Sequence, residues 1–447
     1  MQRRPPAAVA LNALDHFEAL FVNEIVYLYP ATLDAGRLEA SLRQILEFFP
    51  DLCGQAVRGP GGTLGLQWRQ DGAQFRVQEC SAAFPDICSG MYAGYKALDF
   101  IDRVTPFTLT LANTPLARFR LTQLNGGGSV LGISISHGLA DGVSYYQFIH
   151  IWSRMHEGLP WTPPVHGRGL LGCDAGRQHE LFGRQDRLPP VCSGFRCLTR
   201  SELALLVGNF LLRQHTMVTQ TITFTRRQLN AIKRAVAGSG HLSLNDALCA
   251  HLWQTLARTG GVIRPGREYK MQTIASVRGR GALGVPQDYF GNAVTHMITQ
   301  LPGEEILEAD IAHLATHCRK ALESLDDRDV LRQMLWLRHQ EQRGRLHRVM
   351  SNVDLFGGDC IISSMFRLPV DEASFDGQLP SRKAYTVVPA PWIIWLKPWP
   401  QEQGGIEIHA HLPRAFAGRL PSAPVQEALY RFGEADDEKK QATQIGR

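Results

Sequence analysis

The feature that most constrains the fold of this chain is a buried strand that runs directly into an amphipathic helix. Apolar and polar side chains alternate around Phe119, as in a half-buried strand, and Asn125 with the three glycines after it makes a turn. Residues 129–136 (SVLGISIS) predict the buried return strand of a hairpin. Apolar side chains then recur at helical spacing over residues 145–155. Residues 137–142 (HGLADG) therefore lie where a buried strand leaves a sheet for a helix.

The rest of the chain has the same mixed character. Apolar side chains at helical spacing predict a helix that ends before Pro50, and a strand is predicted over residues 216–225. Ser243, with Asp246 three residues later, is a capping-box pattern at the start of another helix. Alternation over residues 406–412 predicts a late strand. The predicted fold class is α/β, with mixed sheets and helices in both halves.

Domain organisation follows from a change in composition near the middle of the chain. Residues 158–190 are rich in Pro, Gly, Arg and His and have no sustained periodicity, which predicts a long crossover over the surface. A chain of 447 residues is about three times a modal domain, so more than one core is expected. We predict an N-terminal domain over residues 1–190, ending in a crossover at about 158–215, and a C-terminal domain over residues 216–447.

Charge and composition exclude several classes of function. The 47 Lys and Arg against 42 Asp and Glu give a net charge of +5 without a basic block, so nucleic-acid binding is not indicated. No apolar stretch reaches the length of a signal peptide core or a membrane span, which predicts a cytoplasmic protein without a membrane partner. The nine cysteines are an odd number without a Cys-x-x-Cys pair, so free thiols are expected.

His137 is the strongest candidate for chemistry. A histidine at the end of a buried strand can line a cleft, and an imidazole there can act as a general base near neutral pH. Asp141, four residues later at a turn, more often binds an arginine or caps backbone amides than touches a substrate. We therefore assign the base to His137 and the fixing of the loop to Asp141.

Other motifs in the sequence are weaker. Residues 279–284 (GRGALG) match a dinucleotide fingerprint but are followed by a proline instead of a long helix, so a loop is expected. His313 and His317 share a helix face but lack the glutamate of a zinc protease motif, which favours a solvated face. His409 and His411 share the polar face of a strand that is expected to be half exposed. No metal site is predicted.

At this point the sequence resembles a known family. Residues 133–148 (ISISHGLADGVSYYQF) are similar to the His-x-x-x-Asp-Gly region of the BAHD acyltransferases, a motif also found in peptide-synthetase condensation domains. Residues 277–294 (VRGRGALGVPQDYFGNAV) resemble a second BAHD segment, which ends in Tyr-Phe-Gly-Asn. Further similar stretches are PLARFRLTQL, PPVHGRGLL and SLNDALCAHLW, in the same order. The resemblance covers most of the chain and favours the BAHD family.

The sequence departs from the family at one further motif. The Asp-Phe-Gly-Trp-Gly segment of the family falls at residues 374–378 (SFDGQ), and the aspartate expected before Arg278 is Ser276. We infer a divergent member of bacterial or fungal type. Asp376, two positions from the family's aspartate, could serve as a substitute partner for Arg278.

The resemblance implies a fold of two similar mixed-sheet domains, like chloramphenicol acetyltransferase, with a channel between them. Acyl-coenzyme A would enter from one face as a co-substrate, with no permanently bound cofactor, and a small alcohol or amine acceptor from the other. His137 would be the general base in a reaction without an acyl-enzyme. The resemblance also implies that Asp141, Gly142 and Arg278 (or Arg280) support the motif. Near the coenzyme it implies Ser243, Tyr289 and Asn292. Near the acceptor it implies Arg367 and Phe375.

The sequence leaves two alternatives open. The acyl donor is either free acyl-coenzyme A, which the Tyr289 to Asn292 match favours, or a thioester on an acyl carrier protein. The second alternative is a non-catalytic binder on the same scaffold. The presence of His137, Asp141 and Gly142 argues against it, because a binder does not need the complete motif. We expect a monomeric acyltransferase of secondary metabolism.

Overall fold

The computed structural model describes residues 9–58, 64–69, 72–93, 96–105, 114–171, 192–386, 388 and 390–433. Part of the predicted crossover, residues 172–191, lies outside the described residues, as does Cys173. The described cysteines are all free thiols.

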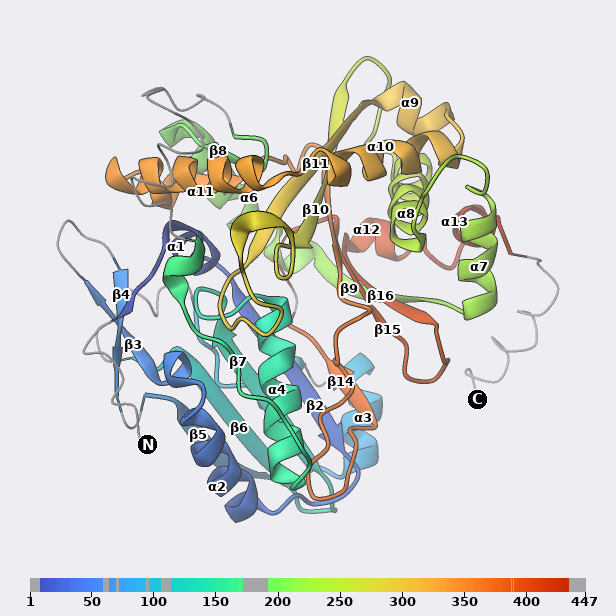
Figure 1. The fold of residues 1–447 in the computed structure, drawn as a ribbon. Helices are drawn as coiled ribbons and strands as arrows, with labels where there is room; N and C mark the ends of the chain where they lie inside the picture. The colour runs from blue at the N-terminus through green and yellow to red at the C-terminus, as the bar shows by residue number, and fades with distance from the viewer. Residues whose placement is uncertain are drawn as a thin grey trace.

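Two mixed sheets form the halves of the molecule, in the lower left and upper right of Figure 1. The N-terminal sheet has the order β14 (Arg382–Ala384), β2 (Val22–Tyr29), β7 (Ser129–Ser136), β6 (Ala117–Leu124) and β5 (Gln74–Cys80). The C-terminal sheet has the order β11 (Val294–Pro302), β10 (Glu268–Ser276), β13 (Cys360–Ser364), β15 (Ile393–Pro398), β16 (Ile406–Pro413) and β9 (Met217–Phe224). Two small sheets pair β1 (Val9–Ala10), β4 (Leu64–Trp68) and β3 (Gly54–Arg58), and β12 (Val349–Ser351) with β8 (Phe195–Cys197).

Helices pack beside both sheets. Those of the N-terminal half are α1 (Ala13–Glu18), α2 (Ala35–Leu46), α3 (Phe84–Ala93) and α4 (Gly142–His156). Those of the C-terminal half are α6 (Arg200–Arg213), α7 (Arg226–Arg234), α8 (Leu244–Gly260), α9 (Gly303–Glu308), α10 (Ile311–Glu323), α11 (Asp327–Gln342), α12 (Arg414–Ala417) and α13 (Ala423–Tyr430). Within the described ranges, no helix is both long and apolar enough to span a membrane.

The predicted hairpin and helix form the centre of the N-terminal half. β6 and β7 pair antiparallel, every residue of β7 is buried, and α2 and α4 lie on one face of the sheet (Figure 1). Phe119 on β6 contacts Phe148 and Trp152 on α4, with ring centroids 5.8 and 5.7 Å apart. The apolar spacing seen in the sequence is therefore the core face of α4, and burial of these aromatic side chains stabilises the strand-to-helix connection.

The C-terminal half has its own core between its sheet and helices. α8 begins at the predicted capping box, since Ser243 accepts from the Asp246 N–H and the Asp246 carboxylate accepts from the Ser243 N–H. Gly261 ends the helix in the left-handed conformation, at φ 69°. Trp253 on α8 packs in the core with side chains of β15 and β16, among them Leu396 and Ile408.

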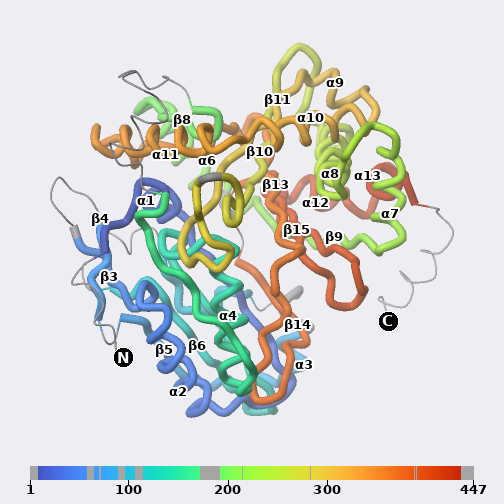
Figure 2. Tube along the Cα trace, in the orientation of Figure 1, coloured from blue at the N-terminus to red at the C-terminus, as the bar shows by residue number. Residues whose placement is uncertain are grey.

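One segment that is late in the sequence, around β14, joins the N-terminal sheet. The predicted domain ranges place this segment in the C-terminal domain. β14 pairs antiparallel with β2, and Figure 2 shows the surrounding chain entering the lower half. The hydroxyls of Tyr27 and Tyr29 donate to the carbonyls of Val370 and Ala373, each at 2.8 Å. In return, α1 packs against α11 of the C-terminal half. The two halves are thus joined by an exchange of segments.

Candidate active site

His137 is the first residue after β7, where the chain leaves the N-terminal sheet. Its backbone N–H donates to the Phe21 carbonyl at 3.1 Å, and its side chain keeps 20% exposure. The Nδ1 atom is enclosed and lies 3.3 Å from Oε2 of Glu18, at ion-pair distance but not aligned as a hydrogen bond. Because Nδ1 is enclosed, the exposed part of the side chain lies elsewhere on the residue.

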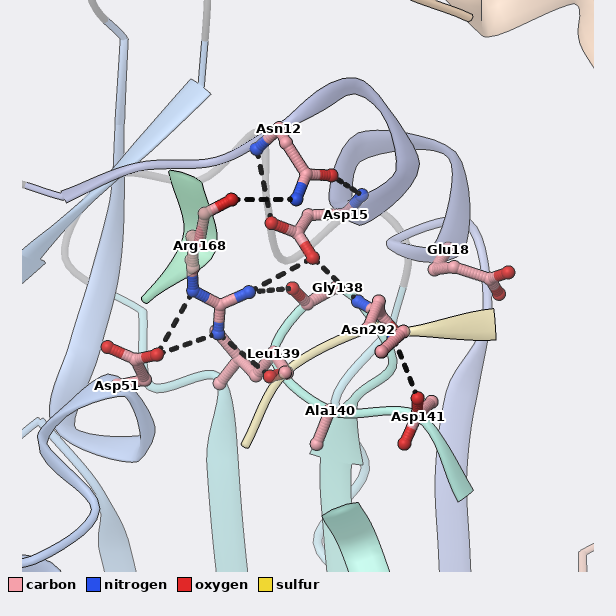
Figure 3. A network of polar contacts seen from close by, with 12 residues as sticks. Asn12, Asp15, Glu18, Asp51, Gly138, Leu139, Ala140, Asp141, Arg168 and Asn292 are labelled. Carbon is pink, nitrogen blue, oxygen red and sulfur yellow. Dashed lines mark hydrogen bonds and ion pairs between the residues drawn. The ribbon is translucent and has the colours of Figure 1, made fainter. Parts of the chain in front are cut away.

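Side chains from three distant segments hold the backbone of the loop after β7, and Figure 3 shows the contacts of one of them, Arg168. The carbonyl of His137 accepts from Asn292 Nδ2 at 2.9 Å, and the carbonyl of Ala140 accepts from Asn23 Nδ2 at 2.7 Å. Arg168 donates to the two carbonyls between them, those of Gly138 and Leu139, at 3.3 and 2.8 Å. Every carbonyl of residues 137–140 therefore has a side-chain donor, which fixes the loop that carries the imidazole.

Arg168 is buried between two carboxylates, as Figure 3 shows. Its guanidinium contacts Asp15 Oδ1 at 3.0 Å and Asp51 Oδ2 at 2.9 Å. Burial opposes the charge, but Asp15 and Asp51 together hold the pKa of Arg168 above its ordinary value. Asp15 also accepts from Asn292 Nδ2 at 2.9 Å, so one polar network joins α1, the crossover and the Tyr-Phe-Gly-Asn segment. The sequence reasoning did not select Asp15, Asp51 or Arg168.

The expected ion pair between Asp141 and Arg278 is present, and both side chains are 1% exposed. The contact is bidentate, at 2.7 and 3.0 Å. The carboxylate also accepts from the N–H of Ser144 at 2.9 Å, so Asp141 is the N-cap of α4. Its other oxygen accepts from the N–H of Ala293 at 2.9 Å. Both oxygens of Asp141 are therefore bound to groups other than His137, and the side chain ties the loop to the C-terminal half. Arg280 is not the partner.

Arg278 also organises the Tyr-Phe-Gly-Asn segment. It donates to the carbonyls of Tyr289 at 3.0 Å and Gly291 at 2.8 Å, and to Oγ of Ser144 at 2.8 Å. Gly291 has φ 145°, and a Cβ there would lie 2.5 Å from the Tyr289 hydroxyl, so the segment needs glycine at this position. The match to the family at residues 289–292 thus corresponds to a packed turn beneath the loop.

Glu18 and His296 complete the surroundings of His137, and the sequence reasoning missed both. Oε1 of Glu18 lies 3.1 Å from Nε2 of His296, while Oε2 faces His137. Burial alone would raise the pKa of Glu18, but the adjacent His137 and His296 outweigh it and hold that pKa below its ordinary value. α1 has only six residues, too few for a periodic signal, and Glu18 is 119 positions from His137, so no local pattern points to it.

The residues expected near the coenzyme are buried or are helix caps in this structure. Asn292 and Tyr289 are both fully buried, with Asn292 holding the His137 carbonyl. Ser243 is the N-cap of α8 and contacts Asp246. Asn292 and Tyr289 therefore support the loop, and neither side chain is exposed.

The structure corrects one expectation about residues 367–376. Phe375 is fully buried in the N-terminal core against Trp152, with ring centroids 4.6 Å apart, and its place near the acceptor stays a prediction. Asp376 does not pair with Arg278; it contacts Arg37 at 2.6 Å and His156 at 3.0 Å. Arg278 is already satisfied by Asp141, which removes the need for a substitute. Arg367 is exposed beside Phe366.

A second correction concerns His409 and His411. The strand β16 was expected to be half exposed, but both imidazoles are buried. Tyr385, just after β14, contacts His409 with ring centroids 4.7 Å apart, and the Nζ atom of buried Lys397 lies over the Tyr385 ring. Burial lowers the pKa of His409 to about 4 and that of His411 to about 3.

The chain is similar to known proteins in both sequence and structure. Residues 11–417 match the family described as the Transferase family. Rosmarinate synthase of Plectranthus scutellarioides is 28% identical over 271 residues, which are 58% of this chain and 57% of that protein. Shikimate O-hydroxycinnamoyltransferase of Nicotiana tabacum is 25% identical over 362 residues, 78% of this chain and 79% of that protein.

Among solved structures, F. graminearum TRI101 complexed with coenzyme A and deoxynivalenol superposes with a TM-score of 0.70. It is 17% identical in sequence, and the superposition covers 92% of this chain and 96% of that one. The likeness shows a common two-domain fold of the chloramphenicol acetyltransferase type. The chain belongs to the Transferase family, whose relatives here are the BAHD acyltransferases that the sequence resembles.

Proposed function

We propose that this protein transfers an acyl group from acyl-coenzyme A to a hydroxyl or amine of a small acceptor, with His137 as the general base. The observation that carries the proposal is the asymmetry of His137. One ring nitrogen is enclosed and faces a buried carboxylate, while the side chain as a whole keeps 20% exposure. Membership in an acyltransferase family supports acyl transfer, and the coenzyme A in the TRI101 structure supports the donor.

The proposed reaction needs one base and no covalent enzyme intermediate. Nε2 of His137 takes the proton of the acceptor hydroxyl or amine while the acceptor oxygen or nitrogen attacks the thioester carbonyl. The tetrahedral intermediate collapses with cleavage of the carbon–sulfur bond. The thiolate leaves and takes up the proton from His137, so the products are the acylated acceptor and free coenzyme A. Asp141, bound to Arg278, keeps the loop in place and does not touch the reacting atoms.

The test is release of free thiol from a panel of acyl-coenzyme A esters, with alcohols and amines as acceptors. We expect His137→Ala to lower turnover by about 10² to 10⁴-fold, the range for a positioned general base. Its melting temperature should stay close to that of the wild type, because His137 is partly exposed. A His137→Ala protein with near wild-type turnover would contradict the mechanism.

The donor is tested with the same assay. Coenzyme A carries phosphates that charge-assisted contacts can bind, so we expect full coenzyme A thioesters to react faster than thioesters of pantetheine. A carrier protein offers a protein surface in place of the nucleotide. If an acyl carrier protein thioester reacts faster than both, the donor is a carrier-bound acyl group and the free coenzyme assignment is wrong.

A further inference from the structure

Glu18 ends α1 between two imidazoles that come from different halves of the molecule. Its Oε2 lies 3.3 Å from Nδ1 of His137, after β7, and its Oε1 lies 3.1 Å from Nε2 of His296, on β11. The carboxylate is only 6% exposed, and a buried carboxylate is costly unless it has partners. The two imidazoles are the partners that make this burial tolerable.

The second imidazole is itself held in one orientation. The amide nitrogen of Gln272 lies 3.0 Å from Nδ1 of His296, and an amide nitrogen can only donate. Nδ1 of His296 therefore accepts, and its hydrogen is on Nε2, which donates to Glu18. Gln333 fixes the backbone of the same residue, since it accepts from the His296 N–H and donates to the His296 carbonyl. One oxygen of Glu18 is thus occupied, and the other is left for His137.

The aspartate of the motif, Asp141, is not the carboxylate that contacts the His137 ring. Both oxygens of Asp141 are bound to Arg278 and to backbone N–H groups, so the motif aspartate cannot reach the His137 ring. Glu18 is the carboxylate that meets Nδ1. An anion beside Nδ1 favours the tautomer with hydrogen on that nitrogen, which leaves the lone pair on Nε2, and it stabilises the imidazolium formed when Nε2 takes a proton.

We propose that Glu18, backed by His296, is the positioning residue that fixes the tautomer and orientation of His137. The catalytic part of this inference rests on the proposed function. The contact is 3.3 Å in the free protein, and such contacts often tighten only when substrate binds. The titratable and charged groups around Glu18 are His137 after β7, His296 on β11, and Asp141 with its partner Arg278.

The first experiment compares Glu18→Gln with Glu341→Gln. Glutamine keeps the size of the side chain and removes its charge. Glu341 provides a matched control, because it makes a carboxylate–imidazole contact with His16 on the same helix. We expect Glu18→Gln to lower kcat by about 10- to 100-fold with KM for both substrates nearly unchanged. Glu341→Gln should leave both kcat and KM unchanged.

A double-mutant cycle shows whether Glu18 acts through His137. In a His137→Ala background, Glu18→Gln should have no further effect on the residual rate, within about twofold. If Glu18→Gln lowers that residual rate by its full factor, Glu18 acts independently of His137 and the proposal is wrong.

A spectroscopic measurement separates this inference from the proposed function. Long-range proton–nitrogen spectra show which ring nitrogen carries hydrogen, and His137→Ala assigns the signal. We expect the neutral His137 ring to carry its hydrogen on Nδ1 in the wild type, and to lose this preference in Glu18→Gln. A wild-type ring with hydrogen on Nε2 overturns the inference even if acyl transfer is established. If the tautomer is as expected and no acyl donor reacts, the positioning contact stands and the proposed function fails.

Discussion

Asp141 has both carboxylate oxygens bound to groups that water does not reach. Replacing Asp141 with Ala leaves the Arg278 guanidinium, which is 1% exposed, without its counter-charge. Removing one partner of a buried pair costs about 3 to 5 kcal/mol, so the urea midpoint of unfolding should fall clearly. The control is Glu39→Ala, which breaks the exposed pair with Arg43 on α2 and should cost less than about 0.5 kcal/mol.

The same comparison tests the assignment of Asp141 to support instead of chemistry. Activity should fall together with stability, because the loop that carries His137 is loosened. If Asp141→Ala is as stable as the wild type and has no turnover, Asp141 acts on the reacting atoms and our assignment is wrong.

At the scale of elements, the loop after β7 fits closely against α1. A Cβ on Gly138 would lie 2.8 Å from Cβ of Ala19 and 2.9 Å from the carbonyl of Asp15. A Cβ on Gly142 would meet only the sulfur of Met365, at an ordinary 3.6 Å. We therefore expect Gly138→Ala to destabilise the protein by about 1 to 3 kcal/mol, because α1 must shift.

Gly142→Ala is the matched control for this prediction and should leave the melting temperature nearly unchanged. Since α1 carries Glu18, Gly138→Ala should also lower the turnover that depends on His137. Equal melting temperatures for the two variants would show that α1 can shift without loss of stability, and this would contradict the packing argument.

The elements that the sequence predicted correctly have strong local signals. β7 spans residues 129–136, the predicted range, because an uninterrupted run of small and apolar residues is buried on both faces. α4 follows at Gly142, since Asp141 caps it and its aromatic residues recur at helical spacing. The capping box at Ser243 likewise marks the start of α8. Local chemistry decides such elements, and the sequence displays it.

The parts that the sequence did not predict depend on contacts between distant segments. Glu18, Asp15 and Arg168 act on the loop from positions far along the chain, and no spacing connects them to His137. β14 joins the N-terminal sheet from residue 382 onward, after most of the C-terminal half. The alternation of polar residues around His409 suggested exposure, because a pattern of period two cannot show whether another segment of the chain covers the polar face.

At the scale of the whole molecule, buried histidine side chains make the free energy of unfolding depend on pH. His251 on α8 is fully buried with Nε2 2.6 Å from the Leu429 carbonyl, and its Nδ1 has no partner within the described chain. Burial lowers the pKa of His251 to about 4, close to that of His409. These rings are neutral in the folded protein at pH 5, whereas an unfolded chain takes up protons near pH 6.5.

The sign of the effect follows from this difference in proton uptake. Below pH 6.5 the unfolded state binds more protons than the folded state, so the free energy of unfolding falls as the pH is lowered. Stability is complete above pH 6.5 and is lost progressively down to about pH 4, where His251 in the folded protein takes up its proton. Each such histidine contributes a loss of up to about 2 kcal/mol between pH 7 and pH 5.

Urea midpoints at pH 7, 6 and 5 should therefore decrease in that order. His251→Gln should reduce the loss, because one titrating group is removed, while His215→Gln, at an exposed position, should leave it unchanged. Midpoints that stay level from pH 7 to pH 5 in the wild type would mean that these buried rings accept protons without unfolding, against the low pKa values that their burial implies.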